Sequence, residues 1–223
     1  MTLVEAAVET PESALAAERA GADRIELCEN LSEGGTTPGE GLIAAVTERT
    51  RIPVFVLIRP RAGGFVYSRN EFEEMTRDIE RAGSLGIAGI VTGALTAQGR
   101  VDVGLTRALI EAAAGLPVTF HRAIDSAANL PAALEETIEA GASRVLTSGG
   151  AATALEGMDV VAALADQAGD RIAVVAAGGI REHNVRDVIA RTGVCEVHAR
   201  LIDEAQMRGL VDAVQGTGRP RNV

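Results

Sequence analysis

Eight short apolar runs divide this chain of 223 residues, and each gives way to a polar residue or glycine and then to a helical pattern. The runs are rich in β-branched residues, whereas stretches such as 11–20, 68–84 and 126–140 repeat apolar residues every three or four positions. A strand followed by a helix, repeated eight times, predicts an α/β fold, a single parallel eight-stranded (β/α)8 TIM barrel. The predicted strands are Leu3–Val8, Arg24–Cys28, Val54–Arg59, Ile87–Thr92, Val118–His121, Arg144–Thr147, Ile172–Ala176 and Cys195–Ala199.

The length suits one such barrel with short loops. Barrels of this kind typically take about 250 residues, and the chain contains no linker or low-complexity stretch. We therefore expect a single domain over residues 1–223.

Charge and aromatic content disfavour two classes of partner. Asp and Glu number 31 against 21 for Lys and Arg, a net charge of −10, and the chain has no Trp and one Tyr. Such a protein repels nucleic-acid phosphates and anionic lipid and offers bases little to stack on. No apolar run approaches the roughly 20 residues of a membrane span, and the N-terminus lacks a signal-peptide pattern. We expect a cytoplasmic protein with neither nucleic acid nor membrane as partner.

Two cysteines, Cys28 and Cys195, are present, without a CxxC pair or a zinc-type spacing. Neither a disulfide framework nor a structural metal site is indicated. The simplest interpretation of each is a small buried hydrophobic residue. Cys28 closes a predicted strand, which leaves a functional role open for it.

Charged residues inside otherwise apolar strands are the first candidates for a site, because barrel active sites lie at the C-terminal ends of the strands. Side chains alternate along a strand, so Glu26 should point into the barrel while its apolar neighbours pack against helices. An isolated buried charge costs several kcal/mol. We therefore predict one network of Glu5, Glu26, Arg59 and His121 across the barrel mouth. A purely structural ion network is the alternative.

The segment "VTFHRAID" (118–125) combines three functional side chains at the end of the fifth predicted strand. His121 can transfer a proton near neutral pH, Arg122 can hold an anion and Asp125 can orient either one. We expect nearby carboxylates to raise the pKa of His121 and the arginines to lower it, which would leave it near working pH. The alternative is a salt bridge from Arg122 to Asp125 that closes a loop. His198 is a weaker second candidate.

Three glycine-rich loops could receive an anion: "EGGTTP" (33–38), "TSGG" (147–150) and "AAGGI" (176–180). Glycine lets backbone N–H groups approach a ligand closely. Barrel phosphate sites commonly use the loops after strands seven and eight, but the eighth loop, "ARLIDE", has no glycine. The alternative for each loop is that its glycines only turn the strand into the helix. No GxGxxG fingerprint is present, so no nucleotide cofactor is indicated.

In order along the chain, "GADRIELC", "EGGTTP", "IPVFVLIRPR", "VTFHRAID", "RVLTSG", "ALEG" and "EVHA" resemble the CutC family, from Val4 to about Ala199. The resemblance implies a cytoplasmic barrel, commonly a homodimer, with a pocket at the strand C-termini and, by name, copper homeostasis and copper binding. Cys28 matches a cysteine of the family's copper proposal, but Ala7 stands where its companion cysteine is usual. Cu(I) prefers thiolate or thioether donors, so the expected thiol pair is incomplete.

Two functions follow as hypotheses: copper homeostasis with copper as the cofactor that the resemblance implies, or a lyase or isomerase for a small anionic metabolite, with or without a phosphate group. A barrel that binds a ligand without turnover is a third possibility. No lysine ends a strand, which argues against a Schiff-base aldolase. The predicted catalytic residues are His121, Glu26, Glu5 and Asp125. The predicted ligand-binding residues are Arg59, Arg61, Arg122, Ser148, Gly149, Gly178, Gly179 and His198. The predicted metal ligand is Cys28.

Overall fold

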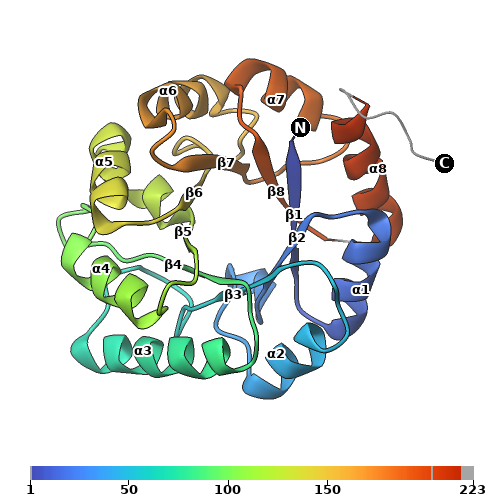
Figure 1. Cartoon of the computed structure of the whole chain (residues 1–223). Coiled ribbons are helices and arrows are strands. Elements are labelled where there is room, and N and C mark those ends of the chain that lie inside the picture. Colours follow the sequence, from blue (N-terminus) through green and yellow to red (C-terminus); the bar gives the residue numbers. More distant parts are fainter. Residues whose placement is uncertain (1, 202, 217–223) are drawn as a thin grey trace.

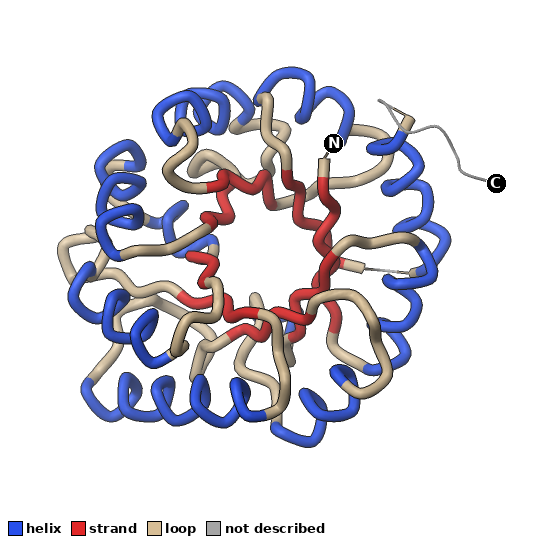
Figure 2. The backbone as a smooth tube through the Cα atoms, in the orientation of Figure 1, coloured by secondary structure: helices blue, strands red, loops and turns tan. Residues whose placement is uncertain are grey.

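The computed structural model describes residues 2–201 and 203–216, and their strands form one closed parallel barrel (Figures 1 and 2). Each strand pairs with the next along the chain, and β1 pairs with β8 to close the ring. The predicted (β/α)8 fold is confirmed. The strands are β1 (Leu3–Val8), β2 (Arg24–Leu27), β3 (Val54–Leu57), β4 (Gly89–Thr92), β5 (Val118–Phe120), β6 (Arg144–Thr147), β7 (Ala173–Ala177) and β8 (Glu196–Arg200).

In the described residues, eight helices surround the strands in the order of the sequence (Figure 1). They are α1 (Pro11–Ala20), α2 (Glu40–Thr47), α3 (Arg69–Ser84), α4 (Val103–Ala112), α5 (Leu130–Ala140), α6 (Met158–Ala168), α7 (Val185–Thr192) and α8 (Glu204–Gln215). Two 3-10 helices lie in βα loops, η1 (Leu31–Glu33) and η2 (Arg122–Ser126). In the described part of the chain, no helix is both long and apolar enough to cross a membrane.

The helical stretch predicted over 126–140 begins later than expected. Residues 122–126 form η2, and α5 starts at Leu130. Asn129 caps the helix by accepting a hydrogen bond from the Ala132 N–H, and Pro131 lies in the first turn, where its missing N–H costs nothing. The loop that carries the predicted site is therefore longer than the sequence pattern indicated.

Strand ends also differ from the prediction, and the differences matter at the barrel mouth. Strands β2, β3 and β5 end before Cys28, Arg59 and His121, respectively. The Cys28 and His121 N–H groups still bond to the neighbouring strands, but the Arg59 N–H donates to the Thr37 hydroxyl at 2.9 Å. Arg59 has thus left the sheet and belongs to the loop after β3.

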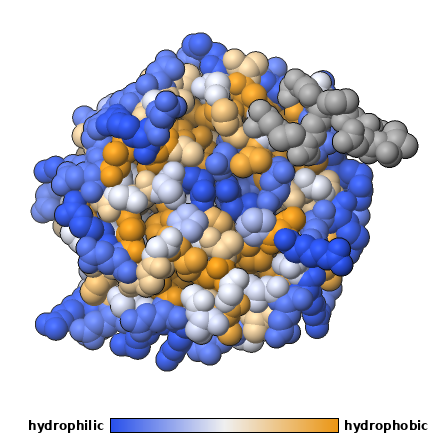
Figure 3. Space-filling model, viewed as in Figure 1, coloured by the Kyte–Doolittle hydropathy of each residue, from blue (hydrophilic) through white to orange (hydrophobic). Residues whose placement is uncertain are grey.

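Two apolar layers lie on either side of the strands. Ile25 and Leu27 belong to the larger cluster that joins strands to helices, as their alternation predicted. The smaller cluster, which includes Phe55 and Leu57, fills the barrel interior. Gly89 makes room for it, since a Cβ there would lie 2.4 Å from the Phe55 ring. The periphery, formed by the outer helices, is mostly hydrophilic (Figure 3).

Candidate functional site

Three neighbouring strands bring together one charged group inside the barrel, here called the Glu5 cluster: Arg24, Glu26, Glu196 and His198 around Glu5. The register places Glu5 of β1 opposite Arg24 of β2 and opposite His198 of β8. Glu5 Oε1 lies 2.7 Å from His198 Nδ1, and Glu5 Oε2 accepts a hydrogen bond from Arg24 Nε at 2.5 Å. Glu5 is therefore fixed from both sides.

Glu26 occupies a different environment from Glu5, although both carboxylates are buried. Glu26 Oε2 lies 3.2 Å from His198 Nδ1 and has no hydrogen-bond partner among the described residues. Burial raises the pKa of Glu26 to about 7, against the opposing charge of His198. Burial would also raise the pKa of Glu5, but the hydrogen bond and charge of His198, with the charge of Arg24, lower it to about 2. Glu5 is the permanent anion and Glu26 is the carboxyl group that titrates near neutral pH.

His198 has a raised pKa. Burial opposes its positive charge, but the charges of Glu26 and Glu5 and the hydrogen bond to Glu5 outweigh that cost. His198, which the sequence indicated as the weaker candidate, is thus the histidine that contacts carboxylates.

Arg59 and His121 do not join the Glu5 cluster, so the prediction of a single network of four residues is wrong. Arg59 Nη1 donates to the Gly35 carbonyl at 2.9 Å and Nη2 donates to the Gly63 carbonyl at 2.8 Å. No carboxylate lies within ion-pair distance of its guanidinium among the described residues. The physical reason is the early end of β3, which puts Arg59 among loop carbonyls.

His121 differs from its prediction in charge. Its Nδ1 accepts a hydrogen bond from the Ala123 N–H at 3.2 Å. Burial, together with the charge of Arg59, lowers the pKa of His121 to about 3. The expectation of a pKa near working pH is therefore wrong, because the carboxylates that would have raised it contact His198 instead. His121 is a neutral imidazole.

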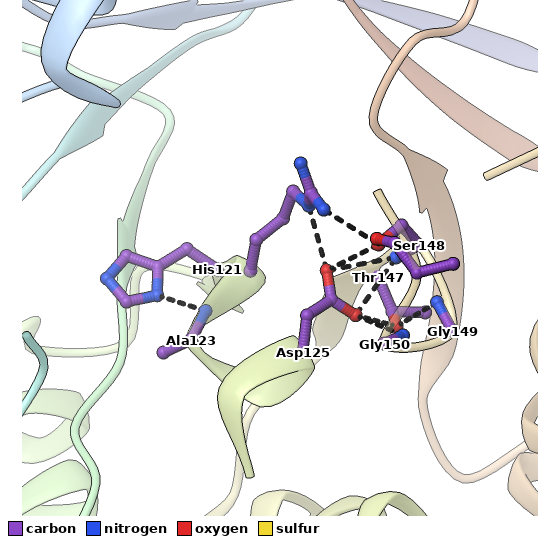
Figure 4. Close-up of polar contacts among 9 residues, drawn as sticks. His121, Ala123, Asp125, Thr147, Ser148, Gly149 and Gly150 are labelled. Atoms are coloured by element: carbon purple, nitrogen blue, oxygen red, sulfur yellow. Dashed lines mark hydrogen bonds and ion pairs between the residues drawn. The ribbon is translucent and has the colours of Figure 1, made fainter. Parts of the chain in front are cut away.

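The loop after β5 builds a third polar group around Asp125 (Figure 4). Arg122 donates to Asp125 at 2.8 Å and to the Ser148 hydroxyl at 2.7 Å. Asp125 also accepts from the Thr147 hydroxyl at 2.6 Å and from the Gly150 N–H at 3.1 Å. The loop-closing salt bridge considered for the sequence is present, and Asp125 holds Arg122 in place.

The predicted ligand-binding glycines make close contacts with protein atoms. A Cβ at Gly178 would lie 3.1 Å from Arg122 Cζ, and one at Gly179 would lie 2.9 Å from Thr153. Gly149 has φ +71° and donates its N–H to the Thr147 hydroxyl at 2.9 Å. These glycines shape the loops around Arg122, and a role in ligand binding stays a prediction for each.

A cavity of about 340 Å³ opens at the C-terminal ends of the strands. Its ionisable lining residues include Glu26, Arg59, His121, Arg122, Asp125 and His198. Glu5 lies behind this lining and acts on the cavity through His198. Arg61 lies outside it and binds Glu71 and the carbonyls of Gly64 and Val66.

The two thiols are far from equivalent. Cys28 is buried, as expected, and its Sγ lies 3.6 Å from the Val8 carbonyl oxygen. Burial, with the negative charges of Glu26 and Glu9, raises its thiol pKa. Cys195 is exposed and precedes β8, at the opposite end of the barrel, so the expectation that it is buried is wrong. One thiol alone lies near the mouth among the described residues.

Oxygen and nitrogen donors, by contrast, converge. Glu5, Glu26 and His198 each offer one ligand atom, and these atoms lie within 4.8 Å of one another. Sequence reasoning named all three residues but missed Arg24, which neutralises Glu5. Arg24 could have been identified from the sequence, because it shares a face of β2 with Glu26 and because a buried Glu5 requires a cation.

The fold and the cavity define a (β/α)8 barrel protein with a polar pocket at its C-terminal mouth. The sequence model of the CutC family matches residues 2–202. A CutC family protein from Xanthomonas axonopodis pv. citri is 50% identical over 196 residues, which are 88% of this chain and 82% of that protein. The human protein named copper homeostasis protein cutC homolog is 48% identical over 196 residues, 88% of this chain and 72% of that protein.

A solved structure of a CutC protein has the same fold. The crystal structure of CutC from Streptococcus agalactiae superposes with a TM-score of 0.83 at 33% identity, covering 89% of this chain and 98% of that one. The chain belongs to the CutC family.

Proposed function

We propose that this protein serves copper homeostasis, as the human relative's name states, and that it binds copper through Glu5, Glu26 and His198. The observation that carries the proposal is Glu26 Oε2, a buried carboxylate oxygen without a hydrogen-bond partner beside two further donors. Two carboxylates and an imidazole suit Cu(II), which takes nitrogen and oxygen ligands. Copper bound there would act as cargo or as a Lewis acid in the cavity.

The thiols do not fit Cu(I). Cu(I) favours soft sulfur donors, and Cys28 is a buried thiol with a raised pKa whose companion position is Ala7. Arg24 sets the limit on the proposed Cu(II) site, because its charge neutralises one carboxylate. We therefore expect moderate Cu(II) affinity and weak Cu(I) affinity.

Competition against a chelator tests this assignment. Wild type, Glu26→Gln, His198→Gln and Cys28→Ser would each be titrated with Cu(II), and separately with Cu(I) under reducing conditions. We expect wild type and Cys28→Ser to bind one equivalent of Cu(II), and Glu26→Gln and His198→Gln to lose it. The electron paramagnetic resonance spectrum of bound Cu(II) should show nitrogen hyperfine coupling. Tight stoichiometric Cu(I) that disappears in Cys28→Ser would contradict the proposal.

A second candidate function is favoured by Arg59 and Arg122, two cations on the wall of one cavity. They suit a small anionic metabolite, and Glu26 and His198 would supply acid and base groups for a lyase or isomerase. A thermal-shift screen of phosphorylated sugars and small carboxylates on wild type and Arg59→Leu checks this. We expect hits whose stabilisation falls in the variant. Equal stabilisation of both proteins by every hit would refute it.

We further propose that the protein acts in the cytoplasm as a homodimer, on the resemblance to its family. Light scattering coupled to gel filtration tests the dimer, and cell fractionation tests the location. A monomer at micromolar concentration would refute the proposed homodimer.

A further inference from the structure

Two buried nitrogen atoms of residues that line the cavity have no hydrogen-bond partner in the part of the chain that the structure describes. They are His121 Nε2 and Arg59 Nε. The guanidinium of Arg59 and the imidazole of His121 each lie 5.0 Å from the ring centre of Phe65, on which both residues pack. A buried donor without a partner costs about 1–3 kcal/mol, so both groups are candidates for contact with a bound molecule.

The hydrogen on the imidazole can be assigned. Because the Ala123 N–H donates to His121 Nδ1 at 3.2 Å, Nδ1 is the acceptor and carries no hydrogen. The neutral ring then holds its proton on Nε2. His121 is therefore fixed as a hydrogen-bond donor, and proton abstraction is not its role. Figure 4 shows its ring turned away from Asp125 and the residues that Asp125 contacts.

Arg59 has little hydrogen-bonding capacity left. Its Nη1 donates to the Gly35 carbonyl at 2.9 Å and to the Glu33 carbonyl at 3.5 Å, and its Nη2 donates to the Gly63 carbonyl. Of the five N–H groups of the guanidinium, Nε–H and one Nη2 N–H remain, together with an uncompensated positive charge. Together the two residues retain three N–H donors and one net positive charge. A carboxylate has the matching charge of −1 and the matching acceptors. Phosphate carries more charge and more acceptors than these donors can satisfy.

We propose that His121 and Arg59 form a receptor for the carboxylate of a small organic acid. The inference deepens the second candidate function and rests on it, because it names the ligand class of the same cavity. The apolar neighbours Leu57, Phe65 and Leu146 line the cavity too, and they suit the carbon skeleton of such an acid.

The test compares L-lactate with lactamide, which replaces the carboxylate by a neutral amide. Both are titrated into protein with 15N-labelled histidine, in wild type, His121→Phe and His121→Gln. Gln can accept from Ala123 and donate into the cavity, whereas Phe keeps the ring and loses both functions. His183→Phe, at an exposed histidine, is the matched control.

We expect lactate to shift the His121 Nε2 resonance and lactamide to leave it unchanged. Lactate affinity should fall about tenfold in His121→Phe, the loss of one charge-assisted hydrogen bond, and return within about threefold in His121→Gln. His183→Phe should bind as wild type. A proton on Nδ1, equal binding of lactamide, or unchanged binding by His121→Phe would overturn the inference. Inorganic phosphate is titrated in parallel, because phosphate binding without lactate binding would overturn this receptor while supporting an anionic metabolite in the cavity.

Discussion

The cavity is bordered by two histidines whose surroundings shift their pKa values in opposite directions. Burial lowers the pKa of both. His198 faces Glu5 and Glu26 across β1 and β2, and these carboxylates raise its pKa overall. His121 has Arg59 as its charged neighbour, so its pKa falls to about 3. The residue type is shared, and the charged neighbours of each ring decide its charge.

The C-terminal mouth of the barrel therefore has two sides that suit different chemistry. The β1, β2 and β8 side is a carboxylate–imidazole cluster suited to a metal ion or a proton. The β3 and β5 side is a donor surface suited to an anion. Each prediction below separates these two sides.

The largest effect is expected at Glu5, which is 1% exposed and contacts two potential cations. Replacing Glu5 by Gln removes one of the two carboxylates that Arg24 and His198 each contact, so Arg24 keeps Glu196 alone and His198 keeps Glu26 alone. Breaking a buried pair in this way costs about 3–5 kcal/mol. Urea unfolding at pH 7 measures the loss of unfolding free energy.

Glu204→Gln is the control for Glu5, because Glu204 pairs with Arg19 and Arg208 at the surface. Its unfolding free energy should hardly change. A Glu5→Gln variant as stable as the control would mean that the Glu5 cluster does not hold the barrel together.

The second prediction concerns pH and the other side of the mouth. The folded-state pKa of His121 lies below its ordinary value of 6.5, so the unfolded chain binds the proton first as the pH falls. His121 should therefore destabilise the fold progressively from pH 6.5 toward pH 3, by about 3 kcal/mol at pH 4.

Urea unfolding of wild type and His121→Gln at several pH values isolates that contribution. The difference in unfolding free energy between the two proteins should shift in favour of the variant as the pH falls. His183→Gln should parallel wild type throughout. A constant difference from pH 7 to pH 4 would show that His121 is charged in the folded protein or is accessible to water.

How far the sequence predicts this site depends on the level of detail. The ends of β1 and β6 match to the residue, and alternation correctly turns Glu26 inward. Alternation does not say which inward side chains lie at the same height in the barrel. That is set by register, which places Glu5 beside Arg24 and His198. Arg59 could not be placed either, because its partners are loop carbonyls rather than side chains with a sequence pattern.

The third prediction concerns Gly178, which lies against the Arg122 side chain. Its φ of +96° is unfavourable for any residue with a side chain, and a Cβ would lie 3.1 Å from the Arg122 guanidinium carbon. Gly178→Ala should destabilise the protein by about 1–2 kcal/mol and weaken binding of an anion that needs Arg122. Gly64→Ala is the control, because nothing lies within 4 Å of its Cβ position. Equal thermal stability of the two variants would show that the loop after β7 adapts freely.

The smallest effect is expected at Cys28, which directly follows β2. Its Sγ is buried beside the Val8 carbonyl oxygen, and a serine hydroxyl could donate to the same oxygen. Because Ser is close to Cys in size, Cys28→Ser should lower the unfolding free energy by no more than about 1 kcal/mol. Lactate and Cu(II) affinities should stay within about twofold, since neither proposed ligand set contains the thiol. Loss of Cu(II) in this variant would place the thiol among the metal ligands, and the assignment of the metal to carboxylate and imidazole donors alone would fail.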